Sequence, residues 1–511
     1  MEGTRVKIIN DIIDWIKDQS AQKIFWLTGW AGTGKSAIAW TICSRTNKDP
    51  EVVLGGSFFF SRSASSAVQR DVRCVMPTLA QILARQSDLF SKALADELTR
   101  DPDVLHKQIS VQIETLLSKP LHALASSPVP IVFVIDALDE CGGESAGEGS
   151  LDDAGAHRIV SEMLEALVAL FNTGAHLPVK FLVTSRPETH IRDTPVSDHE
   201  LSKVLRLQTV DMEQVTKDIR LYIAAKLLST PKLRTRFKSS DADMLAQYCD
   251  GLFIVATTAL KYTFERGNDA AATRFRTMLN VSRDGLSTGA AAPLDRMYTL
   301  ILEDAARTDE PGGDGLAGML QLLAVLLSTR MVLSVAALAD ILSRPTDDVH
   351  AILSRLHAVV HVPDDDGEPG LRTLHASFGD YISRRAPDHI RISSSDSHEA
   401  SARAALRVMA ERLHFNISQS RSSYEANALA ASSGIALSLQ YACTQWVHHL
   451  ASLPDPSVLD AVLGDAFLPR FLFWLEVMSV LGQVQRAAAM LRHIRVTVRP
   501  SSSQYRELLL M

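Results

Sequence analysis

Eight consecutive residues carry the strongest chemical signal in the sequence. They read Gly29-Trp30-Ala31-Gly32-Thr33-Gly34-Lys35-Ser36 and fit the pattern GxxxxGK[ST] in full. Glycines let backbone N–H groups close around phosphate oxygens, and a helix that starts there adds positive potential. Lys35 would reach the terminal phosphates, and the Ser36 hydroxyl would bind Mg²⁺. A chance glycine-rich turn is the alternative, but an apolar run precedes the motif and a helical pattern follows it.

An apolar run that ends in an aspartate is the second signal. Residues 130–140 read PIVFVIDALDE, which predicts a buried strand with Asp136 at its carboxyl end. A carboxylate at that edge of a parallel sheet can meet the magnesium of a bound nucleotide. Asp139 and Glu140 follow, and either could orient an attacking water. A solvated acidic turn is the alternative, and the separate glycine-rich loop favours the magnesium site.

A third run, VKFLVTSRPE at residues 179–188, predicts another strand that ends in polar groups. Thr184 and Ser185 would offer hydroxyls at the same sheet edge, and Arg186 would offer a cation. A guanidinium there could sense the γ-phosphate electrostatically. The alternative is a surface arginine before the turn residue Pro187.

The elements that must position these residues form an alternating pattern. We predict a first helix at residues 6–17, with Val6, Ile9, Ile13 and Ile16 on one stripe. Strands and helices then alternate, which predicts a parallel sheet covered on both faces. The strand candidates are residues 23–28, 52–60, 130–140, 179–188 and 204–208; helices are expected within 72–124 and at 156–172.

After about residue 210 the pattern predicts helices, apart from a hairpin within residues 358–377. The apolar stretch 316–342 contains Arg330 and is interpreted as two packed helices with a turn at 328–331 rather than a membrane span. The acidic glycine-rich segment 141–150 is a candidate for local disorder. The serine-rich segment 391–398 is interpreted as a linker between helical blocks.

Composition narrows the class of protein. The chain has 511 residues, enough for several domains, with 46% hydrophobic and 22% charged residues. The net charge is −7, whereas a protein that binds nucleic acid typically has an excess of basic residues on one face. The N-terminus has no secretory core, and the five scattered cysteines show no metal-ligand or disulfide spacing. We therefore expect a cytoplasmic protein without nucleic-acid or membrane partners.

Taken in order, these motifs resemble the NACHT module of fungal STAND NTPases, which are signal-transducing nucleotide switches. The resemblance rests on GTR, FWLTGWAGTGKS, SFFFSR, VIDALDEC and VTSRPE in the first half of the chain. It continues through DGLFIVA, PLDRMY, the winged-helix signature LHASFGDY, and then LHFNI, YACTQWVHHL and FLFWLEVMSVLG. In many relatives the last region leads to WD40 repeats. This sequence contains no repeat of fixed period, which suggests a truncated or minimal member.

The resemblance implies an α/β P-loop NTPase fold with a parallel sheet and flanking helices, followed by helical lid, winged-helix and helical domains. The implied segments are a lead helix at 1–22, the NTPase core at 23–209, the lid at 210–288, the winged helix at 289–390 and a C-terminal helical domain at 391–511.

The resemblance also assigns roles at matching positions. Asp136 would hold the magnesium, directly or through water, and Asp139 would be the catalytic acidic residue. Arg186 would be the sensor in the core. Thr4 and Arg5 would lie near the nucleotide base. The residues themselves leave the choice between Asp139 and Glu140 open.

From the winged-helix domain, His375 would contact a bound diphosphate and lock the closed form. As a bare residue, a histidine here is more often a satisfied core or turn histidine. The sequence GLF at residues 251–253 lacks the GxP triplet that many relatives place against adenine, so ATP/ADP and GTP/GDP both remain as ligands.

The sequence therefore predicts a Mg²⁺-dependent switch that hydrolyses ATP or GTP slowly and self-associates with triphosphate bound. Its biology, by resemblance, would be self/non-self recognition or innate-immunity-like signalling. One alternative is a housekeeping P-loop enzyme with rapid turnover, although no acceptor-substrate motif is found. Another is a nucleotide-stabilised scaffold whose helical second half binds partners, although Trp446 and Trp474 are spaced like core residues.

Overall fold

The chain folds as two compact units in a computed structural model. The first comprises Met1–Ser145 and Gly149–Leu260, and the second Lys261–Met511. The described residues are 3–61, 67–141, 153–173, 176–188, 191, 200–229, 239–264, 271, 273–278, 280, 293–307, 315–329, 331–363, 370–419 and 434–497. Most of the acidic segment 141–150 and the residue Arg330 lie outside them. The finer division into five segments stays a prediction.

A five-stranded parallel sheet forms the centre of the first unit, in the order β2-β3-β4-β1-β5. The strands are β1 (Ile24–Thr28), β2 (Val53–Phe59), β3 (Ile131–Asp136), β4 (Val179–Ser185) and β5 (Ser202–Arg206). Every residue of β1, β3 and β4 is buried, as expected for parallel strands covered on both faces. Because β4 lies between β1 and β3, the ends of the three chemistry-bearing strands lie side by side.

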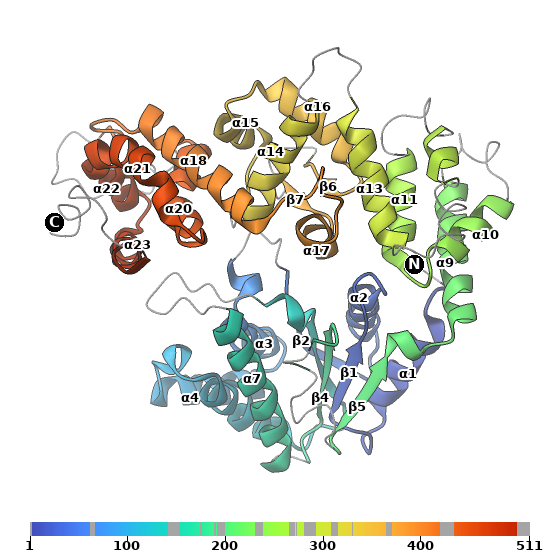
Figure 1. The fold of residues 1–511 in the computed structure, drawn as a ribbon. Helices are drawn as coiled ribbons and strands as arrows, with labels where there is room; N and C mark the ends of the chain where they lie inside the picture. The colour runs from blue at the N-terminus through green and yellow to red at the C-terminus, as the bar shows by residue number, and fades with distance from the viewer. Residues whose placement is uncertain are drawn as a thin grey trace. The chain divides into compact units, whose positions relative to one another are not determined.

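Alternate residues of each strand enter two different cores. Phe25 and Leu27 pack with α1 and α2, whereas Ile24 and Trp26 pack with the helices of the opposite face (Figure 1). The first face carries α1 (Val6–Lys17) and α2 (Lys35–Thr46). The other carries α3 (Val75–Ala84), α4 (Asp88–Arg100), α5 (Ile109–Ile113), α6 (Lys119–Leu121) and α7 (Asp153–Thr173). This arrangement confirms the predicted α/β fold class.

The buried stripe of α1 differs from the predicted one. Ile9 and Ile16 are buried as expected, but Val6 is exposed and Ile13 is only half-buried. Trp15 takes part in the core instead, through an edge contact with Phe25 and a hydrogen bond from its Nε1 to the Gln22 carbonyl. Further members of the stripe are Ile8 and Ile12. The large indole therefore sets the rotation of the helix on the sheet.

Among the described residues of the first unit, three α-helices follow the sheet. They are α9 (Met212–Ser229), α10 (Ser239–Tyr248) and α11 (Phe253–Phe264), and the boundary between the units falls within α11. α9 and α10 pack against each other.

The second unit is mostly helical. Its helices are α13 (Pro293–Ala306), α14 (Gly315–Ser328), α15 (Val335–Leu342), α16 (Thr346–Leu356), α17 (Ala376–Arg384), α18 (Ser394–Arg412), α20 (Leu437–Ala451), α21 (Asp460–Ala466), α22 (Phe471–Val480) and α23 (Val484–Thr497). The predicted hairpin forms from the short antiparallel strands β6 (Val360–His361) and β7 (Arg372–Thr373). None of the helices within the described residues has the length and apolarity needed to cross a membrane.

The serine-rich segment 391–398 is not a linker, contrary to the sequence analysis. Ser393 caps α18 by accepting a hydrogen bond from the backbone N–H of Asp396, and the following residues are helical. Serine is a favoured N-cap because its oxygen satisfies an otherwise unpaired N–H group of the first turn. The stretch 316–342 does form two helices, α14 and α15, with the break where it was expected.

Candidate nucleotide site

The glycine-rich loop runs from the end of β1 into the start of α2. Its first residue, Gly29, donates its N–H to the Ser185 carbonyl at 3.3 Å, which ties the loop to the neighbouring strand. Gly32 and Gly34 have φ angles of 78° and 94°. Side chains disfavour that left-handed region, so glycine is required at both positions. The loop thereby delivers Lys35 as the first residue of α2.

The ammonium of Lys35 bonds to the loop itself. Its Nζ donates to the Gly29 carbonyl at 2.7 Å and to the Trp30 carbonyl at 3.0 Å. Burial lowers the pKa of Lys35, and the carboxylate of Asp139 opposes that shift. The lysine ammonium is therefore held against the loop and feels the carboxylates that follow β3.

Asp136 lies at the end of β3, with only 2% of its surface exposed. Its Oδ1 accepts a hydrogen bond from the Thr184 hydroxyl at 2.5 Å, and the Ser36 hydroxyl lies close enough to affect the same carboxylate. Burial raises the pKa of Asp136, while those two hydroxyls and Lys35 act in the opposite direction. The structure thus brings Ser36, in the first turn of α2, close to Asp136 at the end of β3.

The Thr184 hydroxyl forms a second hydrogen bond at this edge of the sheet. The same hydroxyl accepts a hydrogen bond from the Ala137 N–H at 3.0 Å. Ala137 has a φ angle of 56°, a left-handed conformation that costs roughly 1–2 kcal/mol for a residue with a Cβ. This bond helps to hold the turn that directs Asp139 back toward the sheet.

Asp139 forms a two-point contact with Arg186. Its Oδ1 accepts the Arg186 backbone N–H at 2.8 Å, and its Oδ2 lies 3.0 Å from the guanidinium Nε. The Asp139 side chain is 3% exposed and that of Arg186 is 17% exposed. Glu140 is half-buried next to them. The two residues assigned as acidic catalyst and sensor are therefore bonded to each other.

Arg5 connects the N-terminal segment to the loop and to the helices after the sheet. Its Nη2 donates to the Thr33 carbonyl at 3.1 Å, and its backbone N–H donates to Asp218 on α9 at 3.0 Å. Its guanidinium lies 5.2 Å from the ring centre of Phe253. Arg5 is 7% exposed, yet its Nε and Nη1 find no hydrogen-bond partner among the described residues. Thr4, the other predicted base neighbour, is also buried.

The start of α11 rests directly on the glycine-rich loop. The Ile254 N–H donates to the Gly32 carbonyl at 3.2 Å. A Cβ on Gly32 would lie only 2.1 Å from Cγ2 of Ile254, so the absence of a side chain permits this close approach. The sequence analysis named the GLF segment but did not assign Phe253, Ile254 or Asp218 to the site. Their separation along the chain from Arg5 and the loop hides this contact.

His375 belongs to the second unit, where it is the N-cap of α17. Its Nδ1 accepts the Ser377 backbone N–H at 3.1 Å and lies 2.7 Å from the Ser377 hydroxyl. The Tyr298 hydroxyl forms a further hydrogen bond of 2.9 Å with the Ser377 hydroxyl. Because Nδ1 accepts, the neutral imidazole carries its proton on Nε2. The contact of His375 with a diphosphate stays a prediction.

The residues present fit a magnesium nucleotide. Ser36 and Asp136 offer only oxygen donors, the ligand type that Mg²⁺ prefers. The unpaired nitrogens of Arg5 provide buried donors beside the loop, suited to oxygen or nitrogen acceptors of a ligand.

Comparison with known proteins finds a family match for the part of the chain that contains the candidate site. Residues 3–186, just over a third of the sequence, match the family described as Nephrocystin 3, N-terminal. No curated protein matches the sequence at a significant level.

Solved structures of similar fold include a STAND protein (Signal Transduction ATPase with Numerous Domains) with a tetratricopeptide repeat sensor from Pyrococcus horikoshii. That match has 9% identity and a TM-score of 0.38, and it covers 97% of this chain and 58% of the other. This chain thus spans less than two thirds of that protein. Cdc6p from Pyrobaculum aerophilum matches with 11% identity and a TM-score of 0.33, over 72% of this chain and 89% of the other. The Walker-type ATPase paby2304 of Pyrococcus abyssi matches with 12% identity and a TM-score of 0.33, over 74% and 95%.

Proposed function

We propose that the first unit binds a magnesium nucleotide and hydrolyses it slowly, as the core of a STAND-type signalling switch. The observation that carries this proposal is the proximity of Ser36 to Asp136, whose charged carboxylate the Ser36 hydroxyl favours. It joins the first turn of α2 to the end of β3, so that the phosphate-binding loop and a buried carboxylate converge. An accidental glycine-rich turn would not require such a carboxylate beside it.

In this proposal the backbone of Gly29–Gly34 surrounds the phosphates, with Trp30, Ala31 and Thr33 as the other loop residues. Lys35 exchanges its two carbonyl partners for phosphate oxygens, which offer a stronger, charge-assisted bond. Magnesium, held by Ser36 and Asp136, would neutralise phosphate charge. Arg5 and Thr4 face the nucleoside end, where the free guanidinium nitrogens supply donors. These donors can serve either ATP or GTP.

Hydrolysis in this proposal depends on the pair of Asp139 and Arg186. Asp139 orients the attacking water, and Arg186 holds that carboxylate while sensing the γ-phosphate. A guanidinium attracted by the γ-phosphate would weaken its bond to Asp139, so the pair responds to the state of the nucleotide. Glu140, which lies next to the pair, is the alternative catalytic carboxylate.

The signalling role extends the proposal to the second unit. In this proposal His375 contacts a bound diphosphate, the role that the winged-helix signature implies by resemblance. Exchange for triphosphate would release that contact and permit self-association. Such a switch requires the two nucleotides to bind the two conformers with different affinity. Cytoplasmic signalling of the fungal self/non-self type remains the biological setting that the resemblance suggests.

A fluorescence titration tests the proposal because Trp30 lies in the loop and is 60% exposed. Added ATP or GTP with Mg²⁺ should change the tryptophan emission of the full chain. Trp30→Phe should remove most of that change, and Lys35→Ala should abolish binding. Lys48→Ala provides the matched control, since this exposed lysine follows the other end of α2. Equal binding by the Lys35→Ala protein would contradict the proposed site.

A further inference from the structure

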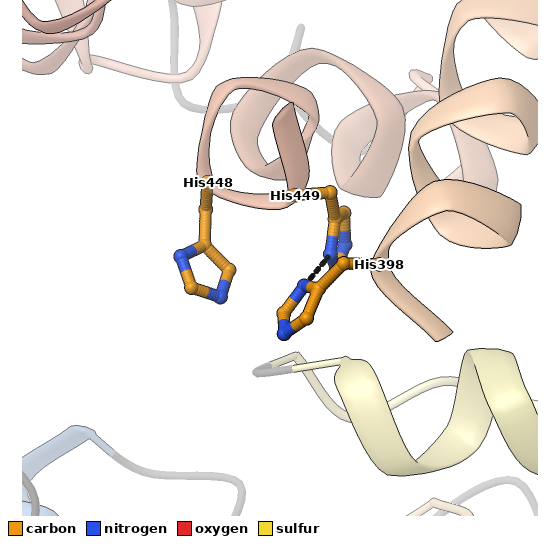
Figure 2. Close-up of side chains that lie close together, drawn as sticks. All are labelled: His398, His448 and His449. Carbon is orange, nitrogen blue, oxygen red and sulfur yellow. Dashed lines mark hydrogen bonds between the residues drawn. The ribbon is translucent and has the colours of Figure 1, made fainter. Parts of the chain in front are cut away.

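A cluster of three imidazoles lies in the second unit, outside everything described so far. His398 comes from α18, and His448 and His449 come from the last turns of α20. These two helices pack against each other, and Figure 2 shows the three rings together at their contact. One nitrogen of each ring lies within 4.8 Å of one nitrogen of each of the others. The sequence analysis missed the cluster because its members are 50 positions apart and no cysteine accompanies them.

The three rings surround a common point. Their centres are separated by 5.2 Å for His398 and His448, 5.3 Å for His398 and His449, and 5.4 Å for His448 and His449. Nearly equal separations give a triangular arrangement. Three imidazoles arranged in this way can direct lone pairs at one cation.

A bound cation would replace the hydrogen bond between the two rings whose nitrogens lie closest together. Nδ1 of His398 and Nδ1 of His449 lie 3.1 Å apart, so one of these nitrogens carries a proton and donates it to the lone pair of the other. In a tetrahedral zinc site with Zn–N bonds of about 2.0–2.1 Å, the ligand nitrogens are about 3.4 Å apart. The pair therefore needs only a small movement to ligate a metal, and the proton between the two nitrogens would move to Nε2 of His398, which leaves both imidazoles neutral.

His449 also has the outer partner that a metal ligand needs. Its Nε2 is 2.8 Å from the hydroxyl of Tyr441, which is fully buried and lies about two turns earlier on α20. Ligating histidines usually bond through their second nitrogen to such a group, which fixes the tautomer and the ring orientation. With Nε2 as donor to the Tyr441 oxygen, Nδ1 presents its lone pair to the cluster.

We propose that His398, His448 and His449 bind a transition-metal ion, with Zn²⁺ as the fitting cation. Neutral imidazoles suit zinc, and a set without carboxylates does not suit Mg²⁺ or Ca²⁺. His398 and His448 are half-exposed, so an ion has access from solvent and water can complete the coordination. The ion would connect the start of α18 to the end of α20 and so stabilise the C-terminal helices.

Equilibrium dialysis of the chelator-treated full chain against Zn²⁺, followed by metal analysis, tests this site. We expect one tightly bound zinc per chain and a higher melting temperature with zinc. Cobalt(II) should give the visible absorption bands of a four-coordinate nitrogen site. His398→Gln and His448→Gln, which change half-exposed residues, should each weaken zinc binding at least 10-fold, as expected for loss of a ligand. Circular dichroism at the same temperature verifies that these variants are folded.

Two control variants make the result specific. His414→Gln changes an exposed histidine of the same region whose Nδ1 bonds to the Phe415 carbonyl, and it should leave zinc binding unchanged. Asp136→Asn removes the carboxylate of the candidate nucleotide site and should also leave it unchanged. The inference is overturned if the wild type binds no stoichiometric zinc, if folded His398→Gln and His448→Gln proteins bind it as well as the wild type, or if Asp136→Asn abolishes binding.

Discussion

Asp139 and Arg186 bond to each other through two separate contacts, one from the arginine backbone and one from its guanidinium. The Asp139 carboxylate is almost fully buried, and an uncompensated buried charge is costly. Each residue therefore depends on the other for its position. A ligand that attracts the guanidinium would change the environment of the carboxylate, and in the proposed function this change would link nucleotide sensing to hydrolysis.

Replacement of the carboxylate by an amide should separate binding from hydrolysis. We expect Asp139→Asn to retain Mg²⁺–nucleotide and to lower the hydrolysis rate by about 100-fold or more, the usual contribution of a general base. Glu140→Gln, the matched change at the next residue, should stay within a few fold of wild type. Single-turnover assays with radiolabelled triphosphate measure both. Normal turnover of Asp139→Asn together with an inactive Glu140→Gln would move the catalytic role to Glu140.

Asp136, the proposed magnesium ligand, should reduce the stability of the fold when no metal is bound. Burial raises the pKa of Asp136, so the folded state holds its proton more tightly than the unfolded state. Stability from this group is therefore lost as pH rises above the usual carboxyl range. We expect Asp136→Asn without nucleotide to be more stable than wild type at pH 7, by about 0.5–2 kcal/mol, and to lose Mg²⁺-dependent binding. Thermal unfolding at pH 4 and pH 7 checks this, and a less stable variant at pH 7 would contradict it.

A side chain at Gly32 should displace α11 from the loop. An alanine there places its Cβ against Ile254 and also adopts a positive φ, so we expect about 1–3 kcal/mol of local destabilisation. Hydrogen exchange of the Ile254 amide, which donates to Gly32, reports the loss directly. Gly482→Ala shares the positive φ but has open space around its Cβ, and it measures the backbone effect alone. Unchanged protection of Ile254 in Gly32→Ala would argue against this packing.

A buried lysine should make stability depend on pH. Lys180 on β4 is 2% exposed, donates to the carbonyls of Trp15 and Asp18, and lies over the Trp15 ring. Burial lowers the pKa of Lys180 to about 8. Between that value and the ordinary lysine pKa, the unfolded chain binds more protons, so this group makes the folded state more stable as pH rises.

Lys180→Met should remove that dependence. Relative to the variant, the wild type should gain up to about 1.4 kcal/mol per pH unit between pH 8 and pH 10. Denaturant unfolding at several pH values measures it, and Lys203→Met, a change at an exposed lysine of β5, is the control. Parallel curves for wild type and Lys180→Met would exclude a lowered pKa.

Local patterns predicted the sheet and the residues at its edge. β1, β3 and β4 are fully buried and mostly apolar, and the residues that could do chemistry lie at or just after their carboxyl ends. Both the type of these elements and their position could therefore be predicted. The meeting of Ser36 with Asp136 follows from parallel strands whose carboxyl ends share one edge.

Contacts between distant segments could not be predicted in the same way. The bond between Arg5 and Asp218 joins residues 213 positions apart, and nothing in either neighbourhood indicates it. The stripe of α1 was misjudged because Trp15, with its large buried surface, determined the helix rotation. The segment 391–398 was interpreted as a linker because it is rich in serine. In the structure, however, the hydroxyl of Ser393 caps a helix. The histidine cluster depends on the packing of α18 on α20, which composition does not encode.

The nucleotide content of the purified full chain tests the central claim most directly. Protein denatured after purification should release ADP, ATP, GDP or GTP in close to one equivalent, and chromatography would identify the base. Lys35→Ala protein, prepared in parallel, should release none. A wild-type protein that is empty, and that also takes up no added nucleotide with Mg²⁺, would contradict the account and leave a helical scaffold with an unused phosphate loop.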